Sequence, residues 1–176
     1  MKSFLLFLLI SCFTEWLAAQ NFFSDTELRN VDGKIVKSGE IFNHNHPVVL
    51  IFWKSYDTKC CDNLENMQSA WLSQLKDKGV RLIAVCVDCN GTWNYVKPIV
   101  YGKAWEFDVY IDVNGDFKRF MGIADVPCTL LLDKNRKIIC RSQGYCTGNE
   151  EFVCEKILQC IEVTEGNSGL QANAQK

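Results

Sequence analysis

Two adjacent cysteines, Cys60 and Cys61, are the residues of this chain whose chemistry is easiest to name. They follow the apolar run PVVLIFW (47–53) and the polar stretch KSYDT (54–58), and they open a segment with helical spacing. A cysteine thiolate attacks disulfides and peroxides, and the partial positive charge at a helix N-terminus stabilises a thiolate. This placement predicts a thiol site at the start of a helix.

Cysteine is abundant elsewhere in the chain as well. The 176 residues include ten cysteines, at positions 12, 60, 61, 86, 89, 128, 140, 146, 154 and 160. An exported protein meets oxidising conditions, in which disulfides form. Nine cysteines would remain after removal of a leader, and an odd number leaves at least one thiol free or used between chains. For Cys154 and Cys160, which lie beside apolar residues of a helical segment, we expect packing as small apolar side chains.

The N-terminus has the pattern of a secretory signal peptide. A lysine precedes the apolar run SFLLFLLISCF (3–13), and small residues follow, which predicts a leader at 1–20 with cleavage near Ala19 or Gln20. The run is too short to span a membrane. LISC (9–12) also resembles a bacterial lipobox, so membrane attachment is expected only if Cys12 is lipidated. We expect an extracytoplasmic protein of the bacterial periplasm or cell envelope, with secretion or lipoprotein anchoring as alternatives.

Composition indicates one globular domain. Apolar residues make up 48% of the chain and charged residues 23%, and the net charge is −2. Lysine and arginine are scattered rather than gathered in a stripe, so no nucleic-acid partner is expected. The sequence predicts a domain at 21–163 and a disordered polar tail at 164–176.

Apolar periodicity predicts an α/β fold, in which a mixed central sheet with an N-terminal β-hairpin is flanked by helices. Strand, helix and strand in succession imply a right-handed parallel crossover. The predicted elements are a hairpin within 27–42, a strand at 47–53, a helix at 61–78, a strand at 80–88, a helical segment at 92–105 interrupted by Pro98, a strand at 108–112, a helix at 116–123, a hairpin of 128–133 and 137–143, and a helix at 148–163.

In this order the chain resembles thioredoxin-fold redoxins of the TlpA/ResA-like or AhpC/TSA-like type over residues 22–162. The segments that carry the resemblance are DGKIV (32–36), HPVVLIFWKSY (46–56), KDKGVRLIAVCVD (76–88), DVNGDFKRFMGIADVPCTLLLDKNRKI (112–138) and GY (144–145). The most specific part is ADVPCTLLLD (124–133). There the resemblance implies a cis Pro127 that, with Val126, Tyr56 and Asp57, shapes a groove for extended peptides.

The family's chemistry lies on a Trp-Cys-x-x-Cys stretch directly after the FW strand. In this register Tyr56 takes the tryptophan position, Asp57 the position of the attacking cysteine, and Cys60 that of the resolving cysteine. Aspartate is a good helix cap but cannot exchange disulfides, and its charge disfavours a thiolate at Cys60. The usual dithiol mechanism therefore lacks its first cysteine.

Other cysteines are candidates to replace it. Sites in α/β sheets gather at the carboxyl ends of the parallel strands. Cys89 follows the neighbouring strand, Cys128 follows Pro127, and Cys146 follows the last strand. We therefore hypothesise that Cys60 or Cys61 works with Cys89 or Cys128; static disulfides or packed thiols are the alternative. Cys86 and Cys89 have CxxC spacing, but an offset of three along a strand points them to opposite faces, which argues against a redox pair.

The resemblance implies an exported thiol–disulfide oxidoreductase with an altered site, acting on protein thiols and disulfides and on extended peptides. One alternative is a non-catalytic binding module of the same fold. Another is a thiol peroxidase using Cys61, because Lys54, Thr58 and Cys61 match the spacing of the peroxiredoxin Pro-x-x-x-Thr-x-x-Cys motif with Lys in place of Pro. No organic cofactor is implied. No metal is expected either, because His44 and His46 precede the first buried strand, at the far edge from the thiols.

Overall fold

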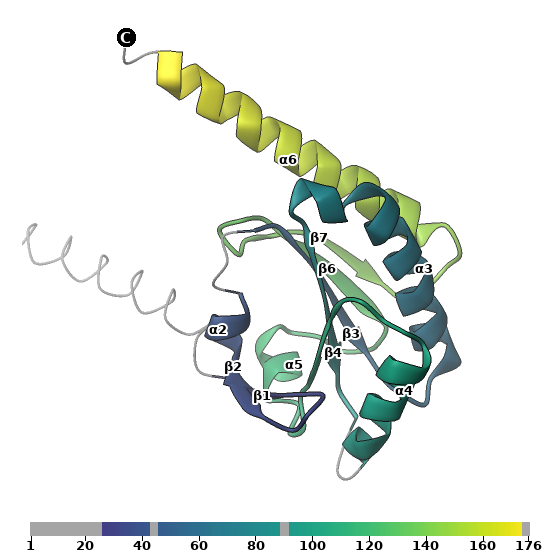
Figure 1. Cartoon of the computed structure of the whole chain (residues 1–176). Helices are drawn as coiled ribbons and strands as arrows, with labels where there is room; N and C mark the ends of the chain where they lie inside the picture. The colour runs from purple at the N-terminus through teal and green to yellow at the C-terminus, as the bar shows by residue number, and fades with distance from the viewer. Residues whose placement is uncertain (1–25, 43–45, 89–91, 174–176) are drawn as a thin grey trace, which may run out of the picture.

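The computed structural model of the chain describes residues 26–42, 46–88 and 92–173, with the side chains of residues 26–42, 46–88 and 94–162. A mixed seven-stranded sheet lies at its centre, in the order β2-β1-β5-β4-β3-β6-β7 (Figure 1). The strands are β1 (Glu27–Asn30), β2 (Ile35–Lys37), β3 (Val48–Trp53), β4 (Arg81–Cys86), β5 (Asp108–Ile111), β6 (Cys128–Leu132) and β7 (Ile138–Gln143). The helices are α2 (Ser38–Ile41), α3 (Thr58–Gln74), η2 (Lys76–Lys78), η3 (Thr92–Tyr95), α4 (Val96–Gly102), α5 (Asp116–Phe120) and α6 (Asn149–Asn173).

The predicted α/β fold is confirmed, including the parallel crossover. Strand β3 runs parallel to β4 and β4 parallel to β5, whereas β6 runs antiparallel to β3 and β7 antiparallel to β6. Strands β3 and β4 are almost wholly buried, as their continuous apolar sequences predict. The β1–β2 hairpin pairs with β5 and extends the sheet at one edge. The carboxyl ends of the three parallel strands therefore meet at one end of the sheet.

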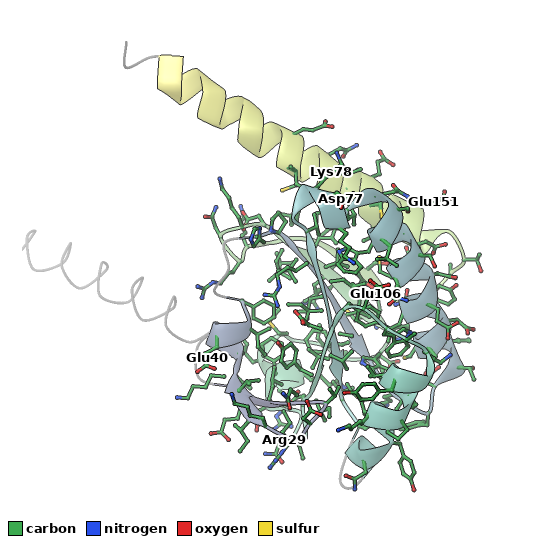
Figure 2. All side chains as sticks on the ribbon, in the orientation of Figure 1. Arg29, Glu40, Asp77, Lys78, Glu106 and Glu151 are labelled. Carbon is green, nitrogen blue, oxygen red and sulfur yellow. The ribbon has the colours of Figure 1, made fainter. Side chains whose placement is uncertain are left out.

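The two faces of the sheet carry separate apolar cores. One core contains Trp53, Ile51 and Cys86 of the sheet and is covered by α3, α4 and α6. The other contains Phe52 and Cys128 and is covered by α2 and α5. Figure 1 shows these two groups of helices on opposite sides of the strands. Charged side chains lie on the outside, as Figure 2 shows for Glu40, Lys78 and Glu151. Successive strand residues point to opposite faces, which places neighbouring residues in different cores.

Helix α3 begins three residues before its predicted start at Cys61. The cause is Asp57, whose side chain accepts hydrogen bonds from the backbone N–H groups of Lys59 and Cys60 and so caps the helix. The predicted inward residues Leu64, Met67 and Trp71 are all buried. The chain then turns through η2 to Gly79, whose φ of 72° suits glycine.

Two other helical segments differ from the prediction. The segment predicted at 92–105 divides into η3 and α4, and Pro98 does not interrupt α4. Pro98 lies in the first turn of α4, where a backbone N–H has no partner within the helix, so its missing donor costs nothing. The predicted strand continuation after β2 is instead the helical turn α2, which carries Ile41 into the core.

Helix α6 is longer than predicted. The sequence predicts that this helix ends at Val163 and that residues 164–176 form a disordered tail. In the structure the helix continues to Asn173. A helix whose first turns are already packed can extend at little cost, because each further residue adds a hydrogen bond without a new nucleation step. In the part of the chain that is described, none of the helices has the length and apolar character needed to cross a membrane.

Candidate active site

The loop after β3 is tied to the end of β4. Asp88, which is 1% exposed, accepts one hydrogen bond from the backbone N–H of Ser55, at 3.0 Å, and another from the Ser55 hydroxyl. The Asp57 backbone N–H donates to the Lys54 carbonyl at 3.3 Å, which closes the turn into α3. This attachment fixes where α3 begins relative to the sheet. Sequence reasoning missed Asp88, whose only signal is a carboxylate ending an otherwise apolar strand.

Asp57 occupies the position at which the resemblance places an attacking cysteine. Its Oδ1 lies 2.9 Å from the Lys59 nitrogen and 3.4 Å from the Cys60 nitrogen. Two backbone N–H groups at a helix N-terminus otherwise lack intrahelical partners, and here the carboxylate provides for both. The side chain therefore has a structural use that a cysteine would serve less well.

Cys60 is part of the apolar core rather than of the surface. Its side chain is 0% exposed and lies among the residues that α3 packs against β3. Burial raises the pKa of Cys60 to about 12, a backbone hydrogen bond with Lys54 opposes this, and the nearby charge of Asp57 adds to it. A buried neutral thiol is poorly suited to a first attack on an external disulfide.

Cys61 is the accessible thiol of the pair. It is half-buried in the first turn of α3, and its Sγ lies 3.8 Å from the Ser55 carbonyl oxygen, to which it donates. Burial raises the pKa of Cys61, the ammonium of Lys103 lowers it, and the carboxylates of Glu65, Asp62 and Asp57 raise it. Of the two adjacent cysteines, Cys61 is therefore the more accessible one, and the ammonium of Lys103 is a cation whose charge acts on it.

The structure does not bring Cys60 and Cys128 together. Cys128 lies opposite Phe52 in the β3–β6 register and is buried in the core under α2 and α5, whereas Cys60 is buried in the core on the other face. Burial also raises the pKa of Cys128, partly offset by Arg141. Cys146 is exposed, and Cys89 lies outside the described residues. The sheet itself separates Cys60 from Cys128, which is one of the pairings that the sequence hypothesis allowed, whereas the pairings with Cys89 lie outside the described residues.

Cys86 is the thiol that sequence reasoning left out and the fold brings to the site. It ends β4 opposite Trp53, so its side chain enters the same core as that of Cys60. Burial raises its pKa well above the ordinary range, and it forms backbone hydrogen bonds with Ser55 and Asp88. Cys60, Cys61 and Cys86 thus all contact the Lys54–Ser55 segment. Each of the three is a free thiol.

The residues predicted to shape a groove lie around the carboxyl end of β3. The Val126–Pro127 peptide is cis, as the resemblance implied. Pro127 precedes Cys128, which pairs with Phe52, so the proline lies near the carboxyl end of β3. The Pro127 carbonyl accepts from the Gly144 N–H at 2.8 Å. Tyr56 is 68% exposed, and the Lys54 ammonium lies 5.8 Å from its ring centroid.

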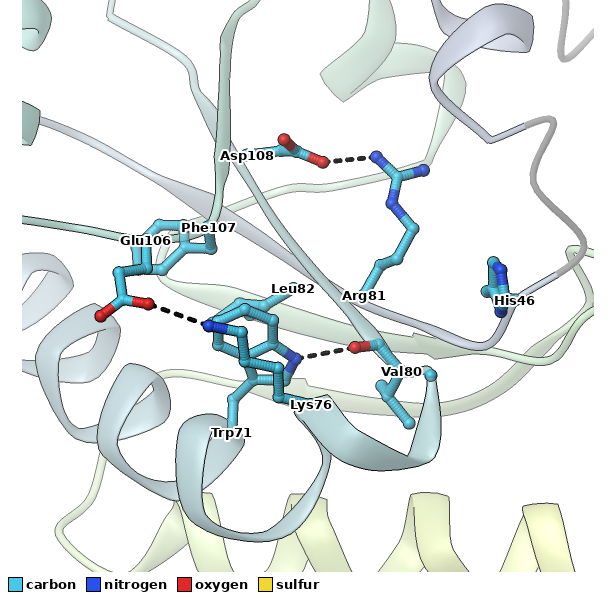
Figure 3. A pocket seen from close by; sticks show the side chains of 10 residues that line it. His46, Trp71, Lys76, Val80, Arg81, Leu82, Glu106, Phe107 and Asp108 are labelled. Atoms are coloured by element: carbon cyan, nitrogen blue, oxygen red, sulfur yellow. Dashed lines mark hydrogen bonds and ion pairs between the residues drawn. The ribbon is translucent and has the colours of Figure 1, made fainter.

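A cavity of about 500 Å³ lies at the other end of the sheet (Figure 3). Its lining includes His46 and the first residues of β4 and β5. The lining also contains two ion pairs, Lys76–Glu106 at 2.9 Å and Arg81–Asp108. Each of these two cations is therefore paired with a carboxylate. His44 lies outside the described residues. Within those residues, no group of three His, Cys, Asp or Glu side chains is arranged to hold a metal ion.

A mixed sheet with helices on both faces, a cis proline opening β6 and a capped helix after β3 define a protein of the thioredoxin-like fold. Solved structures that share this fold include the following two. An uncharacterized thioredoxin-like protein from Porphyromonas gingivalis is 33% identical, with a TM-score of 0.67 over 78% of this chain and 90% of that one. A putative thiol:disulfide interchange protein DsbE from Chlorobium tepidum is 23% identical, with a TM-score of 0.66 over 78% and 96%.

Residues 19–141 match the AhpC/TSA family, and the chain belongs to it. It is similar to the thiol-disulfide oxidoreductase ResA of Bacillus thuringiensis subsp. konkukian, with 29% identity over 121 residues. The match covers 69% of this chain and 64% of that relative. The membership expected from the redoxin-like segments is thereby confirmed.

Proposed function

We propose that this chain is an exported thiol–disulfide oxidoreductase that attacks with a single cysteine, Cys61. The observation that carries the proposal is the half-buried Cys61 sulfur in the first turn of α3, beside the Lys103 ammonium. Cys60 is fully buried, and Asp57, which the resemblance aligns with the usual first cysteine, caps α3. The name of the related ResA, a thiol-disulfide oxidoreductase, supports the class of reaction. Export rests on the signal-peptide pattern of residues 1–20, which lie outside the described residues.

The reaction is a disulfide interchange. The Cys61 thiolate attacks one sulfur of a substrate disulfide, a new S–S bond joins Cys61 to that sulfur, and the other substrate sulfur leaves as a thiolate. A second substrate thiolate then attacks the mixed disulfide at the substrate sulfur, and Cys61 leaves as a thiolate. One disulfide is broken and one is formed, so electrons balance without a further oxidant or reductant.

Extended peptides are the proposed substrates. Pro127 lies near the carboxyl end of β3, from which the chain leads through Tyr56 to the first turn of α3. An extended peptide lying along Val126 and Pro127 would place its sulfur near Cys61. The large exposed surface of Tyr56 offers such a peptide an apolar contact with a polar tip.

The experiment follows the exchange between a peptide carrying a disulfide-linked fluorescent thiol and a second, unlabelled peptide thiol. The full chain is expected to accelerate exchange, and Cys61→Ser to reduce it to the rate of the peptides alone. Cys146→Ser is the matched control, because Cys146 is an exposed thiol outside the site, and it should exchange like the wild type. Far-ultraviolet circular dichroism establishes that each variant is folded. Full activity in Cys61→Ser would overturn the proposal.

One observation favours a second candidate, a non-catalytic binding module. The pKa values of Cys60, Cys61 and Cys128 are all raised, so none of these thiols is activated at neutral pH in the free protein. In this case the chain would bind extended peptides without exchanging their disulfides. Peptide binding equal in wild type and Cys61→Ser, together with an exchange rate no faster than that of free cysteine, would favour the module over the oxidoreductase.

A further inference from the structure

Lys103 links the end of α4 to the surface of α3. It is the C-terminal capping residue of α4, and its ammonium forms an ion pair with the Glu65 carboxylate of α3. The two side chains are 38% and 46% exposed. A solvent-exposed ion pair contributes little to stability. The Lys103–Glu65 pair therefore matters less for folding than for where it holds the ammonium group.

The backbone around Lys103 is well anchored. The Lys103 N–H donates to the Ile99 carbonyl at 2.9 Å, and the Trp105 N–H donates to the Val100 carbonyl at 3.2 Å. Trp105 is buried, with its ring centroid 5.2 Å from that of Trp53. The next residue, Glu106, donates its N–H to the Gln68 side chain of α3 at 2.8 Å. The segment that carries Lys103 thus lies against α3 in a fixed position.

The ion pair lies one helical turn from the reacting thiol. Glu65 follows Cys61 by four residues, which places the two side chains on the same face of α3. The charged groups that act on Cys61 are Asp57 before the helix, Asp62 and Glu65 on it, and Lys103 from α4. Lys103 is the cation among these carboxylates. The pKa of Lys103 is itself raised, mainly by Glu65 and also by Cys61.

We propose that Lys103 is a positioning residue for the Cys61 thiolate and that Glu65 is its resting partner. While Cys61 is protonated, the ammonium is held by Glu65. When Cys61 loses its proton, or leaves from a mixed disulfide, the same ammonium is the counter-ion of the sulfur. An ammonium has three donors on a flexible stem, so it can serve both a carboxylate and a thiolate that project from the same face of a helix one turn apart.

The role of this pair in catalysis rests on the proposed function, whereas its effect on the thiol can be measured without any substrate. The full chain is treated with iodoacetamide across the pH range, and alkylation at Cys61 itself is followed by mass spectrometry, in which the peptide that contains both Cys60 and Cys61 is fragmented to locate the modified residue. Only the thiolate reacts, so the profile reports the ionisation of this one thiol. Lys103→Gln is expected to slow alkylation near neutral pH by about three- to tenfold, since each pKa unit corresponds to a factor of ten.

Glu65→Gln is expected to act in the opposite direction, because it removes a negative charge and leaves the ammonium to the sulfur. Lys103→Arg should keep most of the wild-type rate, because it preserves the positive charge. Lys76→Gln is the matched control, since it breaks the exposed Lys76–Glu106 ion pair near the other end of α3. An unchanged profile in Lys103→Gln, or an equal change in Lys76→Gln, would overturn the inference.

The outcomes also separate this inference from the proposed function. If Lys103→Gln slows alkylation of Cys61 but Cys61→Ser still catalyses exchange, the thiol environment is assigned correctly and the oxidoreductase role of Cys61 is wrong. If Cys61→Ser abolishes exchange but Lys103→Gln changes neither alkylation nor exchange, the oxidoreductase stands and Lys103 has no part in it.

Discussion

Asp57 stands where the resemblance to the redoxins places an attacking cysteine, and its carboxylate instead caps α3 through the N–H groups of Lys59 and Cys60. Cys60 keeps the position of the second cysteine but is buried in the core with a pKa raised to about 12. Cys61, one residue further along the helix, is half-buried, so solvent reaches it more readily than it reaches Cys60. At this scale, the half-buried thiol of the pair lies four residues after the position at which the resemblance places an attacking cysteine.

Asp57→Cys should restore a dithiol. A cysteine three residues before Cys60 at a helix start has the family's spacing, so we expect a disulfide between positions 57 and 60 after mild oxidation, and disulfide reductase activity. The loss of the carboxylate cap is expected to cost about 1 kcal/mol of stability. The measurement is mass spectrometry of non-reduced peptides.

Asp57→Ser is the control for this variant, because serine keeps a capping oxygen without adding a thiol. It should show no gain of reductase activity. In the Asp57→Cys variant, the thiols at positions 57 and 60 should no longer react with an alkylating agent after oxidation. If both still react, the register that aligns Asp57 with the attacking cysteine is incorrect.

At the scale of elements, the buried parts were the most predictable. Strands β3 and β4 carry continuous apolar runs, and the inward residues of α3 have clear helical spacing, so sequence patterns place them closely. The first turn of α3 is polar, so apolar periodicity does not indicate where the helix begins. The start of the helix is set instead by its capping residue, Asp57. The end of α6 was also missed, because the sequence after Val163 has no apolar periodicity that would indicate a helix.

The residues that complete the site could not be predicted from local patterns. Asp88 comes 33 residues after Ser55, and Lys103 comes 38 residues after Glu65. Each contact depends on how two elements pack, and neither residue type is unusual for its own position. Asp57, Cys60 and Pro127 were identified because the resemblance aligns them within single segments.

At the scale of the whole molecule, the sheet decides which thiols can meet. Its two faces carry separate cores, with Cys60, Cys86 and Cys154 on one and Cys128 on the other. The sequence placed Cys60 and Cys128 at the same edge of the sheet, but alternation along a strand sends neighbouring side chains to opposite faces. Buried thiols therefore lie in both cores. Because burial raises their pKa values, the free energy of unfolding depends on pH.

Stability should fall as the solution becomes alkaline. Burial raises the pKa of Cys60 to about 12 and that of Cys154 to about 11, from an ordinary value of 9.0. The folded state thus keeps these protons while the unfolded chain releases them. The contribution is complete below about pH 9 and is lost as pH rises towards the folded values, by up to about 1.4 kcal/mol per thiol and pH unit.

Urea unfolding under reducing conditions, at several values of pH between 7 and 10.5, measures this dependence. The midpoint should fall steadily above about pH 9. Cys154→Ala should show a shallower fall than the wild type, although its stability at neutral pH is lower because a buried side chain is truncated. A midpoint that stays constant over this range would contradict the assignment of buried neutral thiols.

The central claim is that Cys61 is the sulfur that reacts with a substrate disulfide. The reduced full chain is mixed with less than one equivalent of a peptide disulfide, quenched with acid and digested, and the mixed disulfide is located by mass spectrometry. Our account predicts that the peptide is found on Cys61 and that Cys60 remains unmodified, because the first is reachable and the second is 0% exposed. A peptide adduct found on Cys60, or on exposed Cys146 with none on Cys61, would contradict it.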